Sequence, residues 1–370
     1  MKIISATVYG IHLPFIEPFI ISYHTYENMP SVILELRTDD GLVGYGEATP
    51  DEHVTGETFD GVISALTKFL LPGMIGESPF QIEAIHEKMA QLLYGNTSAK
   101  AAIDIACYDL MGKKAGVPVY DLLGGRYHNQ LEVPKVLSIL EPEVMAKQAK
   151  AAKEEGYASI KLKVGTDAKK DVERIRAVRA AVGPHFSIRV DANQGWVTSA
   201  QAISVIRQTE EYDMDWIEQP VVAHDIDALV EVRAKTTIPV MIDEGLHSLK
   251  EMREVISKKA ADKINIKLMK CGGLYRGSQL VHIAEMAGIT CQVGSMVESS
   301  VASAAGLHLA TAKKAIQSHE LVGPLMFSKD VAQLPFTKKF ISLSDKPGLG
   351  IEMDIKKLEE LTSRKIEVNG

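Results

Sequence analysis

Three carboxylates follow three successive apolar runs: Asp191 ends SIRVD, Glu218 ends DWIE and Asp243 ends VMID. Their spacing, roughly one strand plus one helix, predicts that the side chains meet at one rim of a barrel. Three carboxylates brought together would repel one another unless a hard divalent cation bound them. Oxygen ligands alone favour Mg²⁺, with Mn²⁺ as a substitute, over zinc. A single carboxylate at a strand end is more often a helix cap or a surface charge, but three in register predict a metal site.

Lysines lie on either side of the acidic residues. Lys161 and Lys163 alternate in KLK, so both side chains should point into the barrel, and Lys267 follows the run INI. These lysines fall on the second and sixth predicted strands, which are opposite each other in a ring of eight. Burial and neighbouring positive charge lower the pKa of a lysine toward the range in which it acts as a base. Lys270 lies beyond the strand end, where we expect a solvated role.

A divalent cation between two opposed lysines suits removal of a proton α to a carboxylate. The anion that forms must be stabilised, and a metal-bound enediolate is an economical way to do so. With a base on each face, one lysine removes the proton and the other returns a proton to the opposite face. The expected reaction is racemisation or epimerisation of a small-molecule carboxylate.

Length and composition agree with an enzyme of this kind. The chain has 370 residues, which suits a barrel of roughly 250 residues with a further domain. No apolar run is long enough to span a bilayer, and three cysteines without a CxxC pair indicate free thiols in the cytoplasm. A net charge of -7, with both signs mixed along the chain, argues against nucleic-acid binding. We expect neither a membrane nor a nucleic acid as partner.

The periodicity predicts an α/β protein in three parts. An N-terminal α+β capping domain covers residues 1–125, with a hairpin at Asp39-Asp40-Gly41 and a helix that begins at an N-cap, Ser98, and ends at Gly116. A modified TIM-like barrel, (β/α)7β, covers 126–322, and a C-terminal segment, 323–370, packs back on the cap. The predicted barrel strands are Glu132–Ser138, Ala158–Val164, Phe186–Asp191, Met214–Glu218, Pro239–Asp243, Lys263–Lys267, Thr290–Gly294 and Ile316–Leu321.

The segments KLK, DAN, EQP, DEG and NIKLMKCGG, in this order and spacing, resemble the muconate-lactonizing subgroup of the enolase superfamily. Enolase-superfamily sites combine a lysine or histidine base with Mg²⁺. The resemblance runs nearly end to end. Through ISY, DEHVTGE, GNTSAKAAIDIACYD, DWIEQPV and QVGSMVESSVASAAG it is closest to racemases of N-succinylated arginine or lysine, with dipeptide epimerases as near neighbours.

The resemblance implies a role for each site residue. Asp191, Glu218 and Asp243 would bind Mg²⁺, and Lys163 and Lys267 would form the catalytic acid/base pair. Further residues would contact the substrate or support the ligands: Lys161 at the substrate carboxylate, Glu298 in the pocket wall, and Asn193 and Glu244 beside the ligands. The resemblance also implies a symmetric homo-oligomer.

Loops of the cap and the last strand would select the substrate. The segment Tyr23 to Tyr26 offers hydroxyls and His24, and Asp51 and Glu52 offer carboxylates for a guanidinium or ammonium group. Dipeptide epimerases carry an Asp-x-Asp pair on the eighth strand that holds the substrate ammonium. This chain has Glu320-Leu321-Val322 there, which favours an acylated, neutral amino group.

Several other functions share parts of this pattern. A dipeptide epimerase of the L-Ala-D/L-Glu type and a muconate-type cycloisomerase would use the same lysines and metal. Sugar-acid dehydration is disfavoured because Gly294-Ser295 and Lys267 stand where those relatives have a histidine and an aspartate. A non-catalytic barrel would have no need for the complete set of lysines and carboxylates.

Overall fold

Eight short parallel strands form the barrel. The computed structural model describes residues 1–369, and each predicted strand is present in it with ends within two residues of those expected. Around the sheet, the strands stand in the order in which they occur along the chain. These strands are β5 (Pro134–Leu137), β6 (Ser159–Lys163), β7 (Ser187–Asp191), β8 (Trp216–Glu218), β9 (Val240–Ile242), β10 (Lys263–Ile266), β11 (Thr290–Val293) and β12 (Ile316–His319).

The register of β6, β7 and β8 brings Lys163, Asp191 and Glu218 to one level, and Asp243 follows two residues after Met241, the partner of Glu218. Lys163 pairs with Asp191 across β6 and β7, and Asp191 pairs with Glu218 across β7 and β8. Because the strands are parallel, their carboxyl ends lie at the same rim, where a barrel carries its functional groups. The rim therefore collects charged side chains from consecutive strands.

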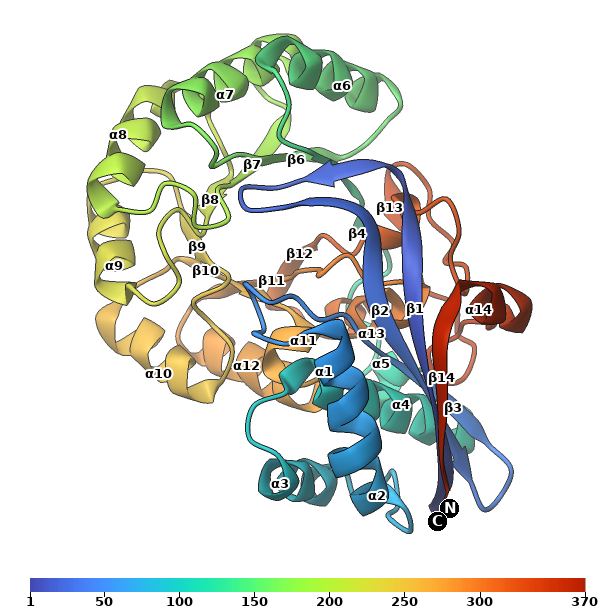
Figure 1. Ribbon diagram of the computed structural model, residues 1–370. Helices are drawn as coiled ribbons and strands as arrows, with labels where there is room; N and C mark the ends of the chain where they lie inside the picture. Colours follow the sequence, from blue (N-terminus) through green and yellow to red (C-terminus); the bar gives the residue numbers. More distant parts are fainter. Residues whose placement is uncertain (370) are drawn as a thin grey trace.

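Helices cover the outside of the barrel after each of the first seven strands, as Figure 1 shows for the green to orange arc. β12 is followed by a 3-10 turn (Gly323–Leu325) instead of a helix, so the predicted (β/α)7β barrel is confirmed. The helices are α6 (Pro142–Glu154), α7 (Ala168–Val182), α8 (Ser199–Thr209), α9 (Ile226–Ala234), α10 (Leu249–Lys258), α11 (Leu268–Cys271), α12 (Leu274–Met286) and α13 (Ser300–Ala312).

The cap is built on an antiparallel sheet in the order β14-β1-β2-β3. The predicted hairpin is confirmed, because its turn joins β2 (Thr25–Thr38) to β3 (Val43–Ala48). β1 (Ile3–Ile20) and β2 also form a long hairpin whose tip extends over the barrel (Figure 1). The remaining elements are α1 (Phe59–Ser64), a π-helical turn (Ala65–Leu70), α2 (Leu71–Met74), α3 (Ile82–Leu92), α4 (Thr97–Ala115), α5 (Val119–Leu122), β4 (Leu131–Glu132), a 3-10 turn (Glu210–Tyr212), β13 (Phe340–Ile341), α14 (Ile355–Leu361) and β14 (Thr362–Asn369).

Helix α4 packs against β3 across a glycine. A Cβ atom at Gly46 would lie 1.9 Å from the carbonyl oxygen of Ala102, so only glycine permits this contact. The predicted stop at Gly116 is confirmed, since this residue caps the helix with φ of 72°. The predicted N-cap, Ser98, is wrong: α4 begins at Thr97, with Asn96 at the N-cap position. The buried Glu57 carboxylate accepts from the backbone N–H groups of Ser98 and Ala99 at 2.8 and 3.1 Å.

Two further sequence predictions concern the whole chain. Cys107, Cys271 and Cys291 are buried free thiols, as expected. Within residues 1–369, none of the helices combines the length and apolar character that crossing a bilayer requires.

Candidate active site

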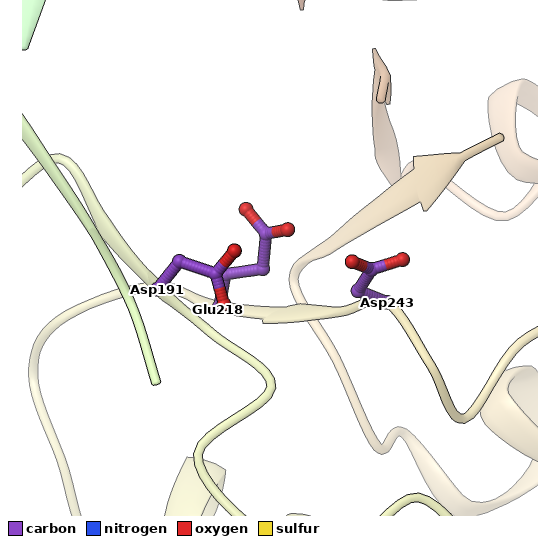
Figure 2. Close-up of side chains that lie close together, drawn as sticks. All are labelled: Asp191, Glu218 and Asp243. Atoms are coloured by element: carbon purple, nitrogen blue, oxygen red, sulfur yellow. The ribbon is translucent and has the colours of Figure 1, made fainter. Parts of the chain in front are cut away.

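The three predicted carboxylates converge. Asp191, Glu218 and Asp243 are each fully buried, and one oxygen from each lies within 4.8 Å of the others. Figure 2 shows the three side chains rising from neighbouring strand ends toward a common space. The sequence spacing alone therefore identified the cluster.

Four buried lysines surround this cluster. Lys161 Nζ lies 2.9 Å from Asp191 Oδ2 and from Glu218 Oε2. Lys163 Nζ lies 2.6 Å from Asp191 Oδ2, and Lys267 Nζ lies 2.7 Å from Asp243 Oδ2. Each carboxylate of the cluster thus has a lysine ammonium as its neighbour.

Lys270 is the fourth lysine, and the prediction of a solvated role for it is wrong. Its side chain is only 1% exposed, and Nζ lies 2.6 Å from Asp243 Oδ1 and 3.1 Å from the carbonyl oxygen of Asn265. The short helix α11 turns the chain directly after β10, and so directs Lys270 back under the rim.

The donor set fits a divalent cation. The three carboxylates supply hard oxygen ligands, the type that Mg²⁺ and Mn²⁺ prefer. Among residues 1–369, Asp243 Oδ2 is a buried oxygen that accepts no well-aligned hydrogen bond, although the Lys267 ammonium lies close to it. An oxygen held out of water in this way is available to a cation.

Burial and charge shift the pKa values in opposite directions within the cluster. Burial, with repulsion from Asp191, raises the pKa of Glu218 well above its ordinary value. For Asp243, burial acts to raise the pKa, but Lys267 and Lys270 outweigh it and hold the pKa low. Glu218 is therefore the carboxylate whose negative charge the protein alone compensates least.

Lys267 does not show the lowered pKa that a base would need. Burial acts to lower its pKa, but the neighbouring Asp243 and Glu244 carboxylates outweigh burial and raise it well above the ordinary value. The protein groups around Lys267 therefore do not lower its pKa, although the sequence analysis expected neighbouring positive charge to do so.

A cavity opens above the cluster, between the barrel rim and the cap. Lys163 and Lys267 both line it, from β6 and from the end of β10. Along the sheet, three strands separate β6 from β10. The two ammonium groups therefore reach the same cavity from different sides of the barrel.

The cap closes this cavity with residues of the β1–β2 hairpin and of the loop that follows β3. Tyr26 Oη donates to Asp51 Oδ2 at 2.6 Å, and Tyr23 Oη lies 3.3 Å from the same oxygen. All three residues line the cavity. Glu52 and His24, the other polar residues predicted here, are exposed and do not line it. Of the two predicted carboxylates, Asp51 therefore faces the cavity and Glu52 does not.

Glu320 lines the cavity from the end of β12, and both of its oxygens are engaged. One pairs with Lys161, and the other accepts from Asn265 Nδ2 at 2.9 Å and Gln292 Nε2 at 2.7 Å. Asn265 and Gln292 were missed by the sequence analysis. Their signal was a single polar residue inside each apolar strand, INI and CQV, where alternation directs the side chain into the barrel.

Two predicted substrate-binding residues are not among those that line the cavity. Glu298 turns back on its own loop, where it accepts from the hydroxyl of Ser295 and from the N–H of Met296. Its neighbours Ser295, Met296 and Val297 form the wall instead. Lys161 lies deeper, is 1% exposed, and pairs with the carboxylates of Asp191, Glu218 and Glu320.

Asn193 lines the cavity, and Glu244 contacts its side chain from beneath the cavity wall. Asn193 Oδ1 accepts from Lys163 Nζ at 3.0 Å, while its Nδ2 donates to Glu244 Oε1 at 2.9 Å. Asn193 also has φ of 39°, in the left-handed region that a non-glycine residue adopts at a cost, and such strain is common at functional sites.

Comparison with known proteins gives both parts of the chain a family. Residues 3–124 match the model for the mandelate racemase / muconate lactonizing enzyme N-terminal domain, and residues 144–357 match the enolase C-terminal domain-like model. The N-succinyl-L-Arg/Lys racemase of Bacillus cereus is 55% identical over 98% of both chains. The hydrophobic dipeptide epimerase of Enterococcus faecalis is 40% identical, over 95% of this chain and 99% of its own.

Solved structures agree with these similarities. The crystal structure of N-succinyl Arg/Lys racemase from Bacillus cereus covers 100% of both chains with a TM-score of 0.99 and 54% identity. The L-Ala-D/L-Glu epimerase of Bacillus subtilis covers 95% of this chain and 99% of its own, with a TM-score of 0.92 and 37% identity. The chain therefore belongs to the enolase superfamily, within its mandelate racemase / muconate lactonizing enzyme family.

Proposed function

We propose that this protein is a Mg²⁺-dependent racemase of N-acyl amino acids with a cationic side chain, such as N-succinyl arginine or lysine. The observation that carries the proposal is that Lys163 and Lys267 line one cavity, from different sides, beside a buried carboxylate cluster. Similarity to a Bacillus cereus protein named for N-succinyl-L-Arg/Lys racemisation supports the choice of substrate.

The two lysines move the proton. One, as the neutral amine, removes the α-proton on its side of the substrate, while the other, as the ammonium, delivers a proton to the opposite side. The roles exchange when the opposite enantiomer is bound. Asn193, which contacts Lys163, and Asp243, which contacts Lys267, would orient the two amines.

Asp191, Glu218 and Asp243 would hold the metal, Mg²⁺ by preference or Mn²⁺ in its place. When bound there, the cation would offset the negative charge that develops on the substrate carboxylate. We propose that Lys161 donates to that carboxylate. Since its ammonium contacts Glu218 and Glu320, one of these contacts would have to yield.

Asp51, from the cap, and Glu320, from the barrel, would distinguish the substrate. Asp51 presents a carboxylate oxygen, oriented by Tyr26, to a guanidinium or ammonium group. Glu320 is already ion-paired with the Lys161 ammonium, which leaves little negative charge to attract a substrate ammonium. The oxygens of Asp51 instead accept from tyrosine hydroxyls and backbone N–H groups, so its charge stays available to a cationic group. An amino group neutralised by acylation suits this cavity better than the free amino group of a dipeptide.

Racemisation of a substrate panel tests the proposal. The panel contains N-succinyl-L-arginine, N-succinyl-L-leucine, L-Ala-L-Glu and cis,cis-muconate, each with Mg²⁺ and with EDTA, followed by chiral chromatography or, for muconate, by ultraviolet absorbance. We expect N-succinyl-L-arginine to racemise fastest and EDTA to stop the reaction. Preferred turnover of L-Ala-L-Glu or of muconate would instead identify a dipeptide epimerase or a cycloisomerase.

We further propose that the enzyme works in the cytoplasm as a homo-oligomer. Three buried free thiols support a reducing compartment.

A further inference from the structure

The loop that carries Asp51 is organised largely by its own hydrogen bonds. The N–H groups of Val54, Thr55 and Gly56 donate to the carbonyl oxygen of Asp51, and those of His53 and Val54 donate to Asp51 Oδ1. These bonds fix the shape of residues 51–56, which we call the Asp51 loop. They do not fix where the loop sits relative to the barrel lysines.

A histidine of the barrel holds the Asp51 loop in its position relative to the barrel. His247, in the connection between β9 and α10, has Nε2 only 2.6 Å from the carbonyl oxygen of Val54. In the described part of the chain, this is the one hydrogen bond between the Asp51 loop and the barrel. The other side of the loop is held by the cap, through Tyr23, which stacks on His53 with ring centroids 4.5 Å apart, and through Tyr26.

The bond requires a proton on Nε2, because a carbonyl oxygen can only accept. Neutral histidine meets this requirement as the Nε2–H tautomer, and protonated histidine meets it as well. The contact therefore does not depend on the protonation state of the ring, and we expect it to persist across the working pH range.

We propose that His247 is a positioning residue for substrate selection. By holding Val54, a residue of the cavity wall, it sets the place of Asp51 relative to Lys163 and Lys267. A substrate whose cationic end reaches Asp51 then has its α-carbon between the two amines. This inference rests on the proposed function, in that Asp51 is taken to bind the cationic side chain.

The surroundings of His247 allow the residue to be shortened. Its ring borders a second cavity of about 290 Å³, lined also by Ser248, Lys250 and Arg276. Replacing the ring by a methyl group enlarges an existing space, so we expect His247→Ala to fold. Lys250→Ala is the matched control, because Lys250 lines the same cavity, is exposed, and within residues 1–369 forms none of the hydrogen bonds or ion pairs of the Asp51 loop.

The test measures KM and kcat separately for N-succinyl-L-arginine and N-succinyl-L-leucine at saturating Mg²⁺. His247→Ala should raise KM for the arginine substrate by about 2- to 10-fold, the range of one hydrogen bond, with a smaller change in kcat and little change for the leucine substrate. His247→Gln, which keeps a side-chain N–H donor, should recover most of the loss. Equal losses on both substrates, or unchanged KM, would overturn the inference.

Hydrogen–deuterium exchange of residues 51–56 separates this inference from the proposed function. The backbone amides of residues 51–56 should exchange faster in His247→Ala than in the parent enzyme or in Lys250→Ala. This expectation does not depend on which substrate the enzyme uses. If the parent enzyme does not favour the arginine substrate, the proposed role of Asp51 is wrong. Faster exchange in His247→Ala would still show that His247 holds the Asp51 loop in place. Unchanged exchange shows that His247 does not hold the loop.

Discussion

At the scale of single residues, the site consists of buried carboxylates and buried lysine ammonium groups that contact one another and offset each other's charge. Removing one member of a buried ion pair leaves the other charge without compensation, which commonly costs about 3–5 kcal/mol of stability. Glu218 offers a milder change than its neighbours. Its partner Lys161 keeps Asp191 and Glu320 when Glu218 is neutralised, and burial already favours the uncharged form of Glu218.

Glu218→Gln should therefore fold and bind Mg²⁺ poorly. Loss of a group that only supports a metal ligand weakens metal affinity by about 10- to 100-fold. Because Glu218 would be a direct ligand, we expect Glu218→Gln to weaken Mg²⁺ affinity by at least this factor. Calorimetric titration with Mg²⁺ measures it. Glu52→Gln, the same change at an exposed position, serves as the control. Parental affinity in Glu218→Gln would remove Glu218 from the ligand set.

Asp51→Asn should change substrate preference more than catalysis. The amide oxygen can still accept from Tyr26, but the charge that attracts a guanidinium is lost. Hydrogen bonds to charged groups contribute about 1.5–3 kcal/mol, so kcat/KM for N-succinyl-L-arginine should fall by about 10- to 100-fold. Comparison with N-succinyl-L-leucine provides the check: equal losses on both substrates would mean that Asp51 does not select the side chain.

At the scale of helices and strands, local periodicity was a reliable guide. Several barrel strands were predictable because they are apolar runs ended by a charged residue, as in SIRVD and DWIE. Contacts between residues far apart in the sequence could not be predicted. Glu57 caps α4 from a separate segment, and Lys270 returns beneath the rim because α11 turns the chain. Neither the Glu57 cap of α4 nor the contact of Lys270 with Asp243 can be identified from spacing along the sequence.

The start of α13 depends on a similar long-range cap. The N–H of Ser300 donates to Asp330 Oδ2 at 3.0 Å, and the N–H groups of Ser299 and Ala302 donate to Glu47. Burial raises the pKa of Asp330 to about 6, with the charge of Glu47 contributing. The folded state therefore holds a proton on Asp330 between about pH 4 and 6, where the unfolded chain has released it.

This shift predicts a pH dependence of stability. The contribution of Asp330 is greatest below about pH 4 and is lost as pH rises through about 6, because the folded state then has to ionise a buried carboxyl group. Asp330→Asn is neutral at every pH. Its melting temperature, relative to the parent, should therefore rise between pH 4 and 7, by about 2 °C or more. A constant difference across this range, measured by calorimetry, would contradict the assignment.

At the scale of the whole molecule, the cavity exists only where cap and barrel meet. The β1–β2 hairpin contributes Phe19, Tyr23 and Tyr26, and the barrel contributes both lysines. β14 pairs with β1, which places the end of the described chain beside its beginning in the cap sheet (Figure 1). The boundaries at residues 125 and 322 stay predictions.

The barrel also separates the two proposed catalytic amines. Lys163 belongs to β6 and Lys267 follows β10, and in the proposed mechanism this separation would allow a proton to leave one side of the substrate and return on the other. A single lysine could exchange the α-proton of one enantiomer but could not invert the centre. The sequence predicted this arrangement because ring position follows directly from strand order.

Stereospecific exchange in deuterated water tests this two-base account most directly. Lys163→Ala and Lys267→Ala are each incubated with N-succinyl-L-arginine and with its D-enantiomer in the presence of Mg²⁺, and loss of the α-proton is followed by NMR, with Lys250→Ala as control. We expect each lysine variant to exchange one enantiomer only, the two variants to differ in which one, and neither to racemise. Exchange of the same enantiomer by both variants, or racemisation at near-parental rate by either, would contradict the account.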